Sequence, residues 1–316
     1  MSACPASLRG PLPEYRDAGD LRLEGDVLGA VVYGPARGAD DPRIINVNLQ
    51  PGRSSGSAEI WRVPGTIATG RDGMIRFAAT EAHLFGMLEI DEREQGGIEA
   101  AAEAAYRAVA AFHRRVAQPH LLRMWNYLDA INEGEGDFER YRQFCLGRAK
   151  GLGEPLLGRY PAGTAIGRKD GVPLLQVYWL AGRSPGRPVE NPRQLQAWRY
   201  PRRYGPAPPS FSRAMLLDGG ELMVSGTASI VGHDSCHADN LFAQLDETLE
   251  NLRELFRMVD GARRVNGMKV YVRPGHAAEP VAEAIRRALP ACSEVLVLEA
   301  DICREELLIE VECVGF

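Results

Sequence analysis

The order of strand-like and helix-like segments in the first half of the chain recurs in its second half. Helix-like segments at 97–116 and 138–152 alternate with apolar runs of strand length in the first half, and segments at 240–259 and 277–289 do so in the second. Segments of both kinds in one repeated order predict an α+β fold. We therefore expect two related halves, each a mixed sheet packed by helices on one face.

The strand-like runs are short and rich in apolar and β-branched residues. Residues 35–82 form a polar stretch to which the sequence assigns no element. The expected strands lie at 26–34, 83–90, 121–131, 164–167 and 174–180 in the first half, and at 214–217, 221–230, 267–273, 294–299 and 307–314 in the second.

A proline-rich segment separates the two halves. Residues 181–209 contain too many prolines for regular structure and are expected to form an ordered linker or a covering loop. The chain of 316 residues is also long enough for two domains of roughly 150 residues each. We therefore expect an N-terminal half at 1–180 and a C-terminal half, with the candidate catalytic residues, at 210–316.

The two halves can be aligned at their last strands. Leu174-Leu175-Gln176-Val177 in the first half corresponds to Leu308-Ile309-Glu310-Val311 in the second, and each run follows a Pro-Ala pair, a strand and a charged turn. In this register Gln176 takes the place of Glu310. Only the second half then has a carboxyl group at that position.

Composition and charge exclude several classes of protein. With 45% hydrophobic and 25% charged residues, the chain resembles an ordinary globular protein rather than a disordered or collagen-like one. No apolar run reaches the roughly 20 residues of a membrane helix, and Met1–Tyr15 lacks the features of a secretion signal. The formal net charge of -5 argues against a nucleic-acid surface. We expect a cytoplasmic protein with neither a nucleic-acid nor a membrane partner.

The six cysteines are scattered without a CxxC pair, which indicates free thiols in a reducing compartment rather than disulfides. The segment from His233 to His237 is dense in potential metal ligands, but no further ligand set with zinc spacing accompanies it. A glutamate or cysteine from elsewhere in the fold could still complete such a site. The sequence predicts no metal and no other cofactor.

Three motifs of the second half stand in a recognisable order. Ser225-Gly226-Thr227-Ala228 is followed by Gln244 and Asn251 on a helix and by Ile309-Glu310-Val311-Glu312 on the last strand. Over roughly the last hundred residues this order resembles the RidA/YjgF family. The resemblance implies that Glu310 lines a pocket and handles a proton. Cys292 stands where that family has its carboxylate-binding arginine, which argues against ordinary RidA imine hydrolysis.

A second resemblance extends over most of the chain. The segments that carry it are Arg123-Met124-Trp125-Asn126-Tyr127, Glu139-Arg140-Tyr141, Arg202-Arg203-Tyr204-Gly205-Pro206, Phe211-Ser212-Arg213-Ala214, Ser225 to His233, and Ala300-Asp301-Ile302-Cys303-Arg304. They resemble the chorismatases, which cleave the enolpyruvyl ether of chorismate and release pyruvate. This resemblance implies two RidA/YjgF-like halves and a reaction without a cofactor.

Chorismate is a dianion, so its binding requires fixed positive groups. Arg123, Arg213 and Arg304 lie on or beside predicted strand ends, where guanidinium groups can hold carboxylates. Each of them could instead be a solvated surface charge. Tyr204, in the proline-rich segment, is a candidate to donate a hydrogen bond to a substrate oxygen, although most aromatic side chains belong to a core or an interface.

Cleavage of a vinyl ether begins with protonation of its methylene carbon, which requires a general acid that is protonated near neutral pH. Glu310 and Glu312 lie two residues apart on one predicted strand and therefore point to the same face. If both are buried, either one is protonated, which suits an acid, or one lies near solvent or an arginine. An edge strand with solvated glutamates is the alternative. We expect Glu310 to be the proton donor.

Two positions bear on the product through the chorismatase resemblance. A cysteine at the position of Cys303 accompanies formation of 3-hydroxybenzoate, whereas a smaller residue accompanies hydrolysis to a dihydroxycyclohexadiene acid. Ala214 differs from the glycine often found in 3-hydroxybenzoate formers. The combination resembles the bifunctional chorismatases of aryl-polyene pigment producers, which form both 3- and 4-hydroxybenzoate. Cys303 could alternatively be a small thiol that fills core volume.

The sequence thus predicts a chorismatase that forms pyruvate and 3-hydroxybenzoate, with or without 4-hydroxybenzoate. Glu310 and Cys303 are the expected catalytic residues, and Arg123, Tyr204, Arg213, Ala214 and Arg304 are expected to contact the substrate. Hydrolysis of chorismate to the dihydroxy acid, and RidA-like binding without turnover, stay open. A duplicated chain can build internally the contact that RidA proteins make between subunits, so a monomer and a homotrimer are both open.

Overall fold

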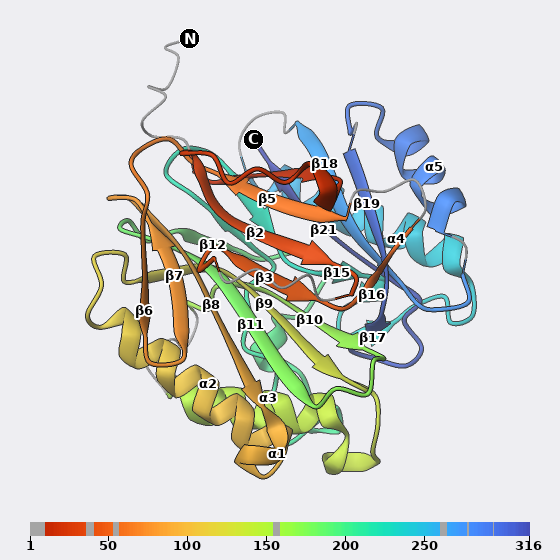
Figure 1. Cartoon of the computed structure of the whole chain (residues 1–316). Helices are drawn as coiled ribbons and strands as arrows, with labels where there is room; N and C mark the ends of the chain where they lie inside the picture. The colour runs from red at the N-terminus through yellow and green to blue at the C-terminus, as the bar shows by residue number, and fades with distance from the viewer. Residues whose placement is uncertain are drawn as a thin grey trace.

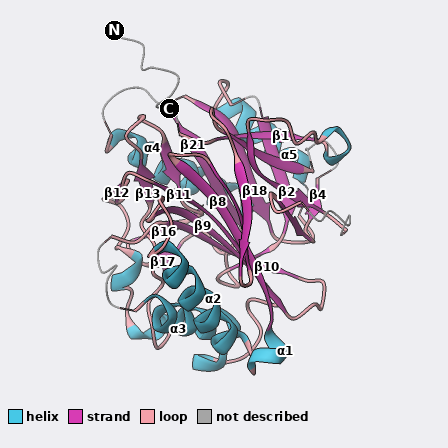
Figure 2. Ribbon diagram, turned by 60° about the vertical axis from the view of Figure 1, so that its left-hand side comes forward, coloured by secondary structure: helices cyan, strands magenta, loops and turns pink. Residues whose placement is uncertain are grey.

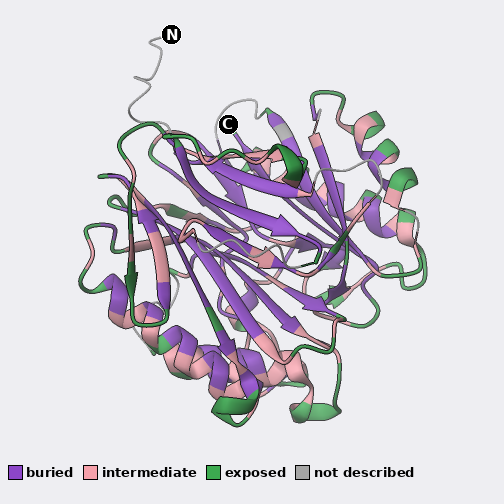
Figure 3. Ribbon diagram, in the orientation of Figure 1, coloured by how far each residue is buried: buried purple, intermediate pink, exposed green. Residues whose placement is uncertain are grey.

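Two mixed β-sheets lie face to face at the centre of the molecule, with helices on their outer sides (Figure 1 and Figure 2). Most strand residues are buried (Figure 3). One apolar cluster lies between the sheets, and two more lie between a sheet and its helices. The α+β architecture expected from the sequence is thereby confirmed. The computed structural model describes residues 10–35, 41–52, 57–153, 159–259, 264–276, 278–292 and 294–316.

The first sheet carries the helices of the first half. Among the described residues its strand order is β6-β7-β8-β11-β9-β10-β20, in which β9 and β10 run parallel. Helices α2 (Ile98–His113) and α3 (Arg140–Leu152) pack on its outer face, and α1 (Glu92–Gln95) precedes them. The strands are β6 (Ala68–Asp72), β7 (Ile75–Ala79), β8 (His83–Asp91), β9 (His120–Asp129), β10 (Ala162–Arg168), β11 (Leu174–Gly182) and β20 (Asp301–Ile302).

The second sheet carries the helices of the second half. Its strand order in the described residues is β12-β13-β14-β21-β18-β19-β4, and β15 pairs with β21 beside β14. Helices α4 (Leu241–Arg257) and α5 (Ala278–Ala288) pack on its outer face. The strands are β4 (Gln50–Pro51), β12 (Arg187–Val189), β13 (Ala214–Leu216), β14 (Leu222–Val224), β15 (Thr227–Ala228), β18 (Val265–Val272), β19 (Glu294–Glu299) and β21 (Ile309–Gly315).

The two sheets have the same strand order. The order from β6 to β20 in the first sheet matches the order from β12 to β4 in the second, so that β11 corresponds to β21 and β9 to β18. Gln176 on β11 is opposite Tyr127 on β9, and Glu310 on β21 is opposite Tyr271 on β18. Gln176 and Glu310 therefore occupy equivalent positions, as the alignment of the two halves predicts.

Each sheet ends on a short strand from the other half of the chain. β20, from near the C-terminus, pairs with β10 of the first sheet, and β4, from near the N-terminus, pairs with β19 of the second. These strands cross the boundary expected between 1–180 and 210–316. The chain also forms a four-stranded sheet and a two-stranded sheet, from β1 (Leu12–Arg16), β5 (Ala58–Arg62), β2 (Val27–Tyr33) and β3 (Ile44–Val47), and from β16 (Ile230–Val231) and β17 (Asp234–Ser235).

Helices α2 and α3 approach each other closely where α3 carries a glycine. A Cβ atom at Gly147 would lie 2.0 Å from the carbonyl oxygen of Glu99 and 2.9 Å from the Cβ of Ala102. Only a residue without a side chain fits at this contact. The contact fixes the position of α3 and of the adjacent Arg148, which is buried.

Most predicted elements are present with small shifts at their ends, and β19 spans the predicted residues. The interpretation of 35–82 as a polar stretch without strands was wrong, because β3 to β7 lie there. Strand β6 is largely exposed, so it lacks the apolar alternation that reveals a strand. The prediction of one continuous strand at 221–230 is also wrong. The segment forms three short strands, with interruptions at Ser225-Gly226 and at Ser229.

The proline-rich segment 181–209 is ordered and contains more regular structure than its composition predicts. It holds β12 and two 3-10 helices, Ala197–Arg199 and Arg202–Tyr204. Pro188 is compatible with β12 because that strand lies at the edge of its sheet. An edge strand pairs with a neighbour on one side only, so the missing N–H of proline need not remove a hydrogen bond of the sheet. The predicted helix start at Ala277 and the first nine residues of the chain lie outside the described residues.

Candidate active site

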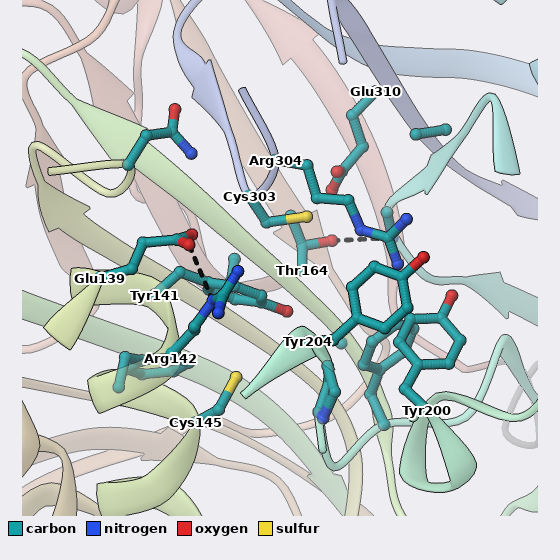
Figure 4. Close-up of a pocket in the computed structure, with 18 of the residues that line it drawn as sticks. Glu139, Tyr141, Arg142, Cys145, Thr164, Tyr200, Tyr204, Cys303, Arg304 and Glu310 are labelled. Carbon is teal, nitrogen blue, oxygen red and sulfur yellow. Dashed lines mark hydrogen bonds and ion pairs between the residues drawn. The ribbon is translucent and has the colours of Figure 1, made fainter. Parts of the chain in front are cut away.

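A cavity of about 310 Å³ lies where the two halves of the chain meet. This volume falls within the range of small-molecule sites, about 300–1,000 Å³. Helix α3 and strand β10 of the first half form one wall, and the segment before β13 together with β15 and β21 forms another. Figure 4 shows the side chains that point into it from both halves.

The Glu310 side chain lines this cavity from β21. It is 5% exposed, and no described residue donates a hydrogen bond to its carboxyl group. Burial, followed by the negative charge of Glu312, raises the pKa of Glu310 to about 8, although Arg123 and Arg213 act in the opposite direction. At neutral pH the carboxyl group is therefore protonated and can act as a general acid.

The strand opposite Glu310 is interrupted at Ser225-Gly226, between β14 and β15. These two residues contact β10 instead: the Gly163 amide donates to Ser225 Oγ (2.8 Å), and the Gly226 amide donates to Thr164 Oγ1 (2.9 Å). A Cβ atom at Gly226 would lie 1.9 Å from Glu310 Oε1. The interruption and the glycine together make room for the carboxyl group.

Glu312, on the same face of β21, is surrounded by donors. Its Oε1 accepts hydrogen bonds from Lys269 Nζ (2.6 Å) and Trp125 Nε1 (2.7 Å). Its Oε2 accepts from Arg123 Nη2 and Thr164 Oγ1, both at 2.6 Å. Burial alone would raise the pKa of Glu312, but the charges of Lys269 and Arg123 lower it. This carboxylate is therefore ionised, whereas its neighbour on the strand is not.

Arg213 lines the cavity as one of the predicted arginines. Its side chain is almost fully buried, and its Nη2 donates to the carbonyl of Leu195 (2.8 Å) and to the hydroxyl of Tyr200 (2.7 Å). Its Nε has no hydrogen-bond partner among the described residues. The two hydrogen bonds from Nη2 hold the guanidinium in place beside the cavity.

Arg304 and Tyr204 form a stacked pair at the cavity (Figure 4). The guanidinium carbon of Arg304 lies 4.2 Å from the centroid of the Tyr204 ring. Arg304 Nη1 and the Tyr204 hydroxyl both donate to the carbonyl of His233, at 2.9 and 2.7 Å. Tyr204 therefore contributes its ring to the wall, and its hydroxyl proton is used by the protein backbone.

Arg148 on α3 also lines the cavity, and the sequence analysis did not identify it. Its side chain is 4% exposed, and its Nε and Nη2 have no hydrogen-bond partner among the described residues. A buried guanidinium with unused N–H groups beside a cavity is suited to an anionic ligand. One signal was present in the sequence: Arg148 adjoins Gly147, on a part of the helix that packs against another helix.

Two predicted site residues lie outside the cavity lining. Arg123, 1% exposed on β9, lies between the sheets, where it binds Glu312 and Thr164. Ala214 is fully buried at the start of β13, opposite Val224 in the apolar cluster beneath α4. The structure therefore separates these two residues from Glu310, Cys303, Tyr204, Arg213 and Arg304, which it brings together at one cavity.

Cys303 lies beside Glu310 in the cavity wall (Figure 4). Burial, followed by the charge of Glu310, raises the pKa of the Cys303 thiol, so the thiol is protonated at neutral pH. Tyr141 and Cys145 of α3, which were not predicted, line the same cavity. The cysteines in the described residues are free thiols, namely Cys145, Cys236, Cys292, Cys303 and Cys313, and Cys4 lies outside these residues.

In the described part of the chain, no group of three or more His, Cys, Asp or Glu side chains is arranged to hold a metal ion. His233 and Asp234, from the ligand-rich segment of the sequence, instead contact Arg203. None of the helices in the described ranges combines the length and the apolar character that crossing a membrane requires.

Comparisons with known proteins agree with this geometry. Residues 59–181 match the family described as "Chorismatase FkbO/Hyg5-like, N-terminal". A chorismatase of Streptomyces hygroscopicus is 33% identical, over 99% of this chain and 96% of that protein. The chain belongs to the chorismatase family. The resemblance found in the sequence is thereby confirmed.

Other chorismatase-family proteins match over similar lengths. A chorismatase of Streptomyces rapamycinicus is 35% identical, over 96% of this chain and 97% of that protein. A 3-hydroxybenzoate synthase of Streptomyces hygroscopicus is 32% identical, over 85% of this chain and 84% of that protein. A crystal structure of chorismatase has a TM-score of 0.87 and 32% identity, and the alignment covers 97% of this chain and 98% of that one.

Proposed function

We propose that this chorismatase-family protein converts chorismate to 3-hydroxybenzoate and pyruvate, with Glu310 as the proton donor. The observation that carries the proposal is a buried, protonated carboxyl group in the wall of a cavity that is also lined by arginines, some of whose N–H groups have no partner in the described residues. The relatives named chorismatase and 3-hydroxybenzoate synthase support this substrate and this product.

The arginines match the charge of the substrate. Chorismate carries two carboxylates, and a guanidinium group binds a carboxylate through paired N–H donors. Arg148 and Arg213 each have a buried N–H group without a partner in the described residues, and Arg304 lies at the same cavity. We assign carboxylate binding to these three residues. Arg123 is not included, because its guanidinium is bound to Glu312.

The first chemical step transfers a proton. The Glu310 carboxyl group gives its proton to the methylene carbon of the enolpyruvyl group, which becomes a methyl group. The ether carbon then carries the positive charge of an oxocarbenium ion, and Glu310 becomes a carboxylate. This step requires the neutral acid. Because the carboxyl group is protonated at neutral pH, it is ready to donate its proton when the substrate binds.

The second step releases pyruvate and forms the aromatic ring. The neighbouring ring hydroxyl attacks the carbon that holds the ether oxygen, that C–O bond breaks, and pyruvate leaves with both bonding electrons on its oxygen. The hydroxyl proton returns to Glu310, and the resulting epoxide opens and aromatises to hydroxybenzoate. No water is consumed. Cys303, a neutral thiol beside Glu310, restricts the space in which a competing water could attack.

The proposal also extends to the number of chains that form the site. Its walls come from α3, β10, β15 and β21 of the same molecule, so catalysis by a monomer is part of the proposal. Free thiols such as Cys145 and Cys303 suit a reducing compartment. We therefore place the reaction in the cytoplasm.

The test is to incubate the purified protein with chorismate in a buffer that contains a metal chelator. Both pyruvate and the ring products are then measured. Pyruvate and 3-hydroxybenzoate in equal amounts are the expected result, and 4-hydroxybenzoate beside them would indicate a bifunctional enzyme. Pyruvate with the dihydroxycyclohexadiene acid would show hydrolysis and contradict the assigned second step. Saturable binding without pyruvate would contradict turnover altogether.

A further inference from the structure

Four charged side chains are buried together between the sheets, behind the wall that carries Glu310. Glu59 lies on β5, Arg123 on β9, Lys269 on β18 and Glu312 on β21, and their exposures are 1%, 1%, 0% and 4%. Lys269 Nζ lies 2.6 Å from Glu312 and is also bound to Glu59, and Arg123 Nη2 lies 2.6 Å from Glu312. We call these four residues the buried charge cluster.

Glu59, at the end of the cluster farthest from Glu310, accepts hydrogen bonds from several donors, as Glu312 does. Glu59 accepts hydrogen bonds from the Tyr33 hydroxyl (2.8 Å) and from Trp61 Nε1 (2.6 Å), in addition to Lys269. Lys269 Nζ also donates to the Tyr178 hydroxyl at 3.0 Å. The cluster therefore runs without a gap from the four-stranded sheet to the strand of the candidate acid.

The cluster is electrically neutral only when both of its carboxylates are ionised, because it contains two cations and two anions. A net charge buried in such a place is strongly unfavourable. Glu310 lies two residues from Glu312, so its ionisation would add a negative charge beside a cluster that is already balanced. Burial is the first cause that keeps the proton on Glu310, and the negative charge of Glu312, which belongs to the cluster, is the second.

Other groups face Glu310 from the elements packed around it. Their charges act on the same proton, but the cavity arginines bind substrate carboxylates and are neutralised when chorismate enters. The cluster is outside the cavity and keeps its charge throughout. Besides Glu312 and Arg123 of the cluster, the titratable and charged groups that face Glu310 are Arg213 before β13, Tyr271 opposite it on β18, Tyr141 on α3, and Cys303 and Arg304 after β20.

We propose that Glu59 is a positioning residue for the acid and acts through Lys269 and Glu312 to hold the proton on Glu310. Without the charge of Glu59, Lys269 would carry an unbalanced positive charge, which favours the ionised form of Glu310. The four-stranded sheet, which carries Glu59 on β5, then has a role in the chemistry. The inference rests on the proposed role of Glu310 as the proton donor.

The pH dependence of kcat/KM tests this chain of effects. Activity needs protonated Glu310, so it is lost as the pH rises through the pKa of that group, near 8 in the unchanged protein. Glu59→Gln should move this alkaline limb to lower pH by about one unit. Lys269→Met should move it to higher pH, and the double variant, which is neutral again, should return it towards the original position.

The matched control is Glu92→Gln. Glu92 is equally buried, at 3% exposure, and is bound by Arg140 through both carboxylate oxygens, away from the cavity lining. Its loss should lower the thermal midpoint of unfolding without moving the alkaline limb. Shifts of the same sign in Glu59→Gln and Lys269→Met, or no shift in either, would overturn the proposal. Each single variant has its own expected sign, so a shift of the wrong sign in either one contradicts the proposal even if the other variant does not fold.

A second readout does not depend on turnover. The infrared C=O stretch of protonated Glu310, isolated as the difference between the wild-type protein and Glu310→Gln, can be titrated without chorismate. In Glu59→Gln this band should disappear at lower pH than in the wild-type protein. If Glu310→Gln still released pyruvate, the role of Glu310 would fail, yet a shifted band would show that Glu59 controls its proton. An unshifted band would contradict the inference itself.

Discussion

Gln176 and Glu310 occupy equivalent positions in the two halves of the molecule, yet their surroundings are opposite. Gln176 is 2% exposed, and its Nε2 donates to the carbonyl of Asn46 and to Glu89 Oε1, both at 2.7 Å. Glu310 faces a cavity, and its carboxyl group has no such partner in the described part of the chain. The side chain at position 176 is thus part of the core, whereas the carboxyl group at position 310 can contact a ligand in the cavity.

The strand next to each position explains the difference. In the first half β8 continues past Gln176 without a break, and Glu89 is directly opposite it. In the second half the corresponding strand stops at Ser225-Gly226 and turns to β10. One repeated fold therefore produces a single site, because a strand was interrupted in one half and remained continuous in the other.

The comparison predicts that the site fails when its acid is replaced by the residue type found in the first half. Glu310→Gln keeps the shape of the side chain but cannot donate the proton, so pyruvate release should fall by about 10³-fold. Steady-state pyruvate formation measures the loss, and an unchanged circular dichroism spectrum shows that the fold is intact. Turnover close to that of the wild-type protein would refute the assignment of Glu310.

A single methyl group at the strand interruption should have the next largest effect. The Cβ of Gly226→Ala would lie 1.9 Å from Glu310 Oε1, so the carboxyl group must move. A displacement of about 1 Å in a catalytic group lowers kcat by about 100-fold. The measurement is kcat and KM for chorismate. A loss confined to KM would mean that Gly226 shapes substrate binding rather than the position of the acid.

The product should change more than the rate in Cys303→Ala. The acid is retained, so pyruvate release should stay within about tenfold of the wild-type rate. The extra space beside Glu310 admits water, and the ring products should shift from hydroxybenzoate to the dihydroxycyclohexadiene acid. Chromatography of the products against standards measures this ratio. Unchanged products would assign Cys303 to the packing of the wall.

The smallest effect on activity is expected from the reverse exchange, Gln176→Glu. The new carboxylate would lie beside Glu89 and lose the hydrogen bond to the Asn46 carbonyl, so the free energy of unfolding should fall by about 2 kcal/mol. Activity should not change, because β8 continues without a break beside position 176. Urea unfolding and pyruvate release measure the two effects. Increased turnover would show that the first half retains a usable site.

The sequence predicts the repeated elements well because their strands are apolar on both faces or alternate regularly. β19 is entirely apolar between its terminal glutamates and was predicted at its observed bounds. Of the strands missed within 35–82, β6 is mostly exposed, whereas β3 and β5 are mostly buried. Their pairing depends on neighbouring strands rather than on their own composition, and a pattern search along the chain does not detect that.

The candidate site could be predicted only in part for a related reason. Glu310 follows from its register and from the family resemblance, whereas Arg148 looks like any other arginine on a helix until its burial is known. Arg123 matches the family motif but is bound to Glu312. Which partner a charged side chain finds across the fold is a property of the tertiary structure, so the residue type alone does not decide between a ligand contact and an ion pair.

The exchange of the short end strands β4 and β20 between the sheets ties the two halves into one cooperative unit. A fragment that contained only residues 1–180 would lack β20, and a fragment that contained only residues 210–316 would lack β4. Each fragment would expose an unpaired sheet edge, which is a template for aggregation. A gene split between the halves would therefore yield insoluble pieces rather than two separable domains.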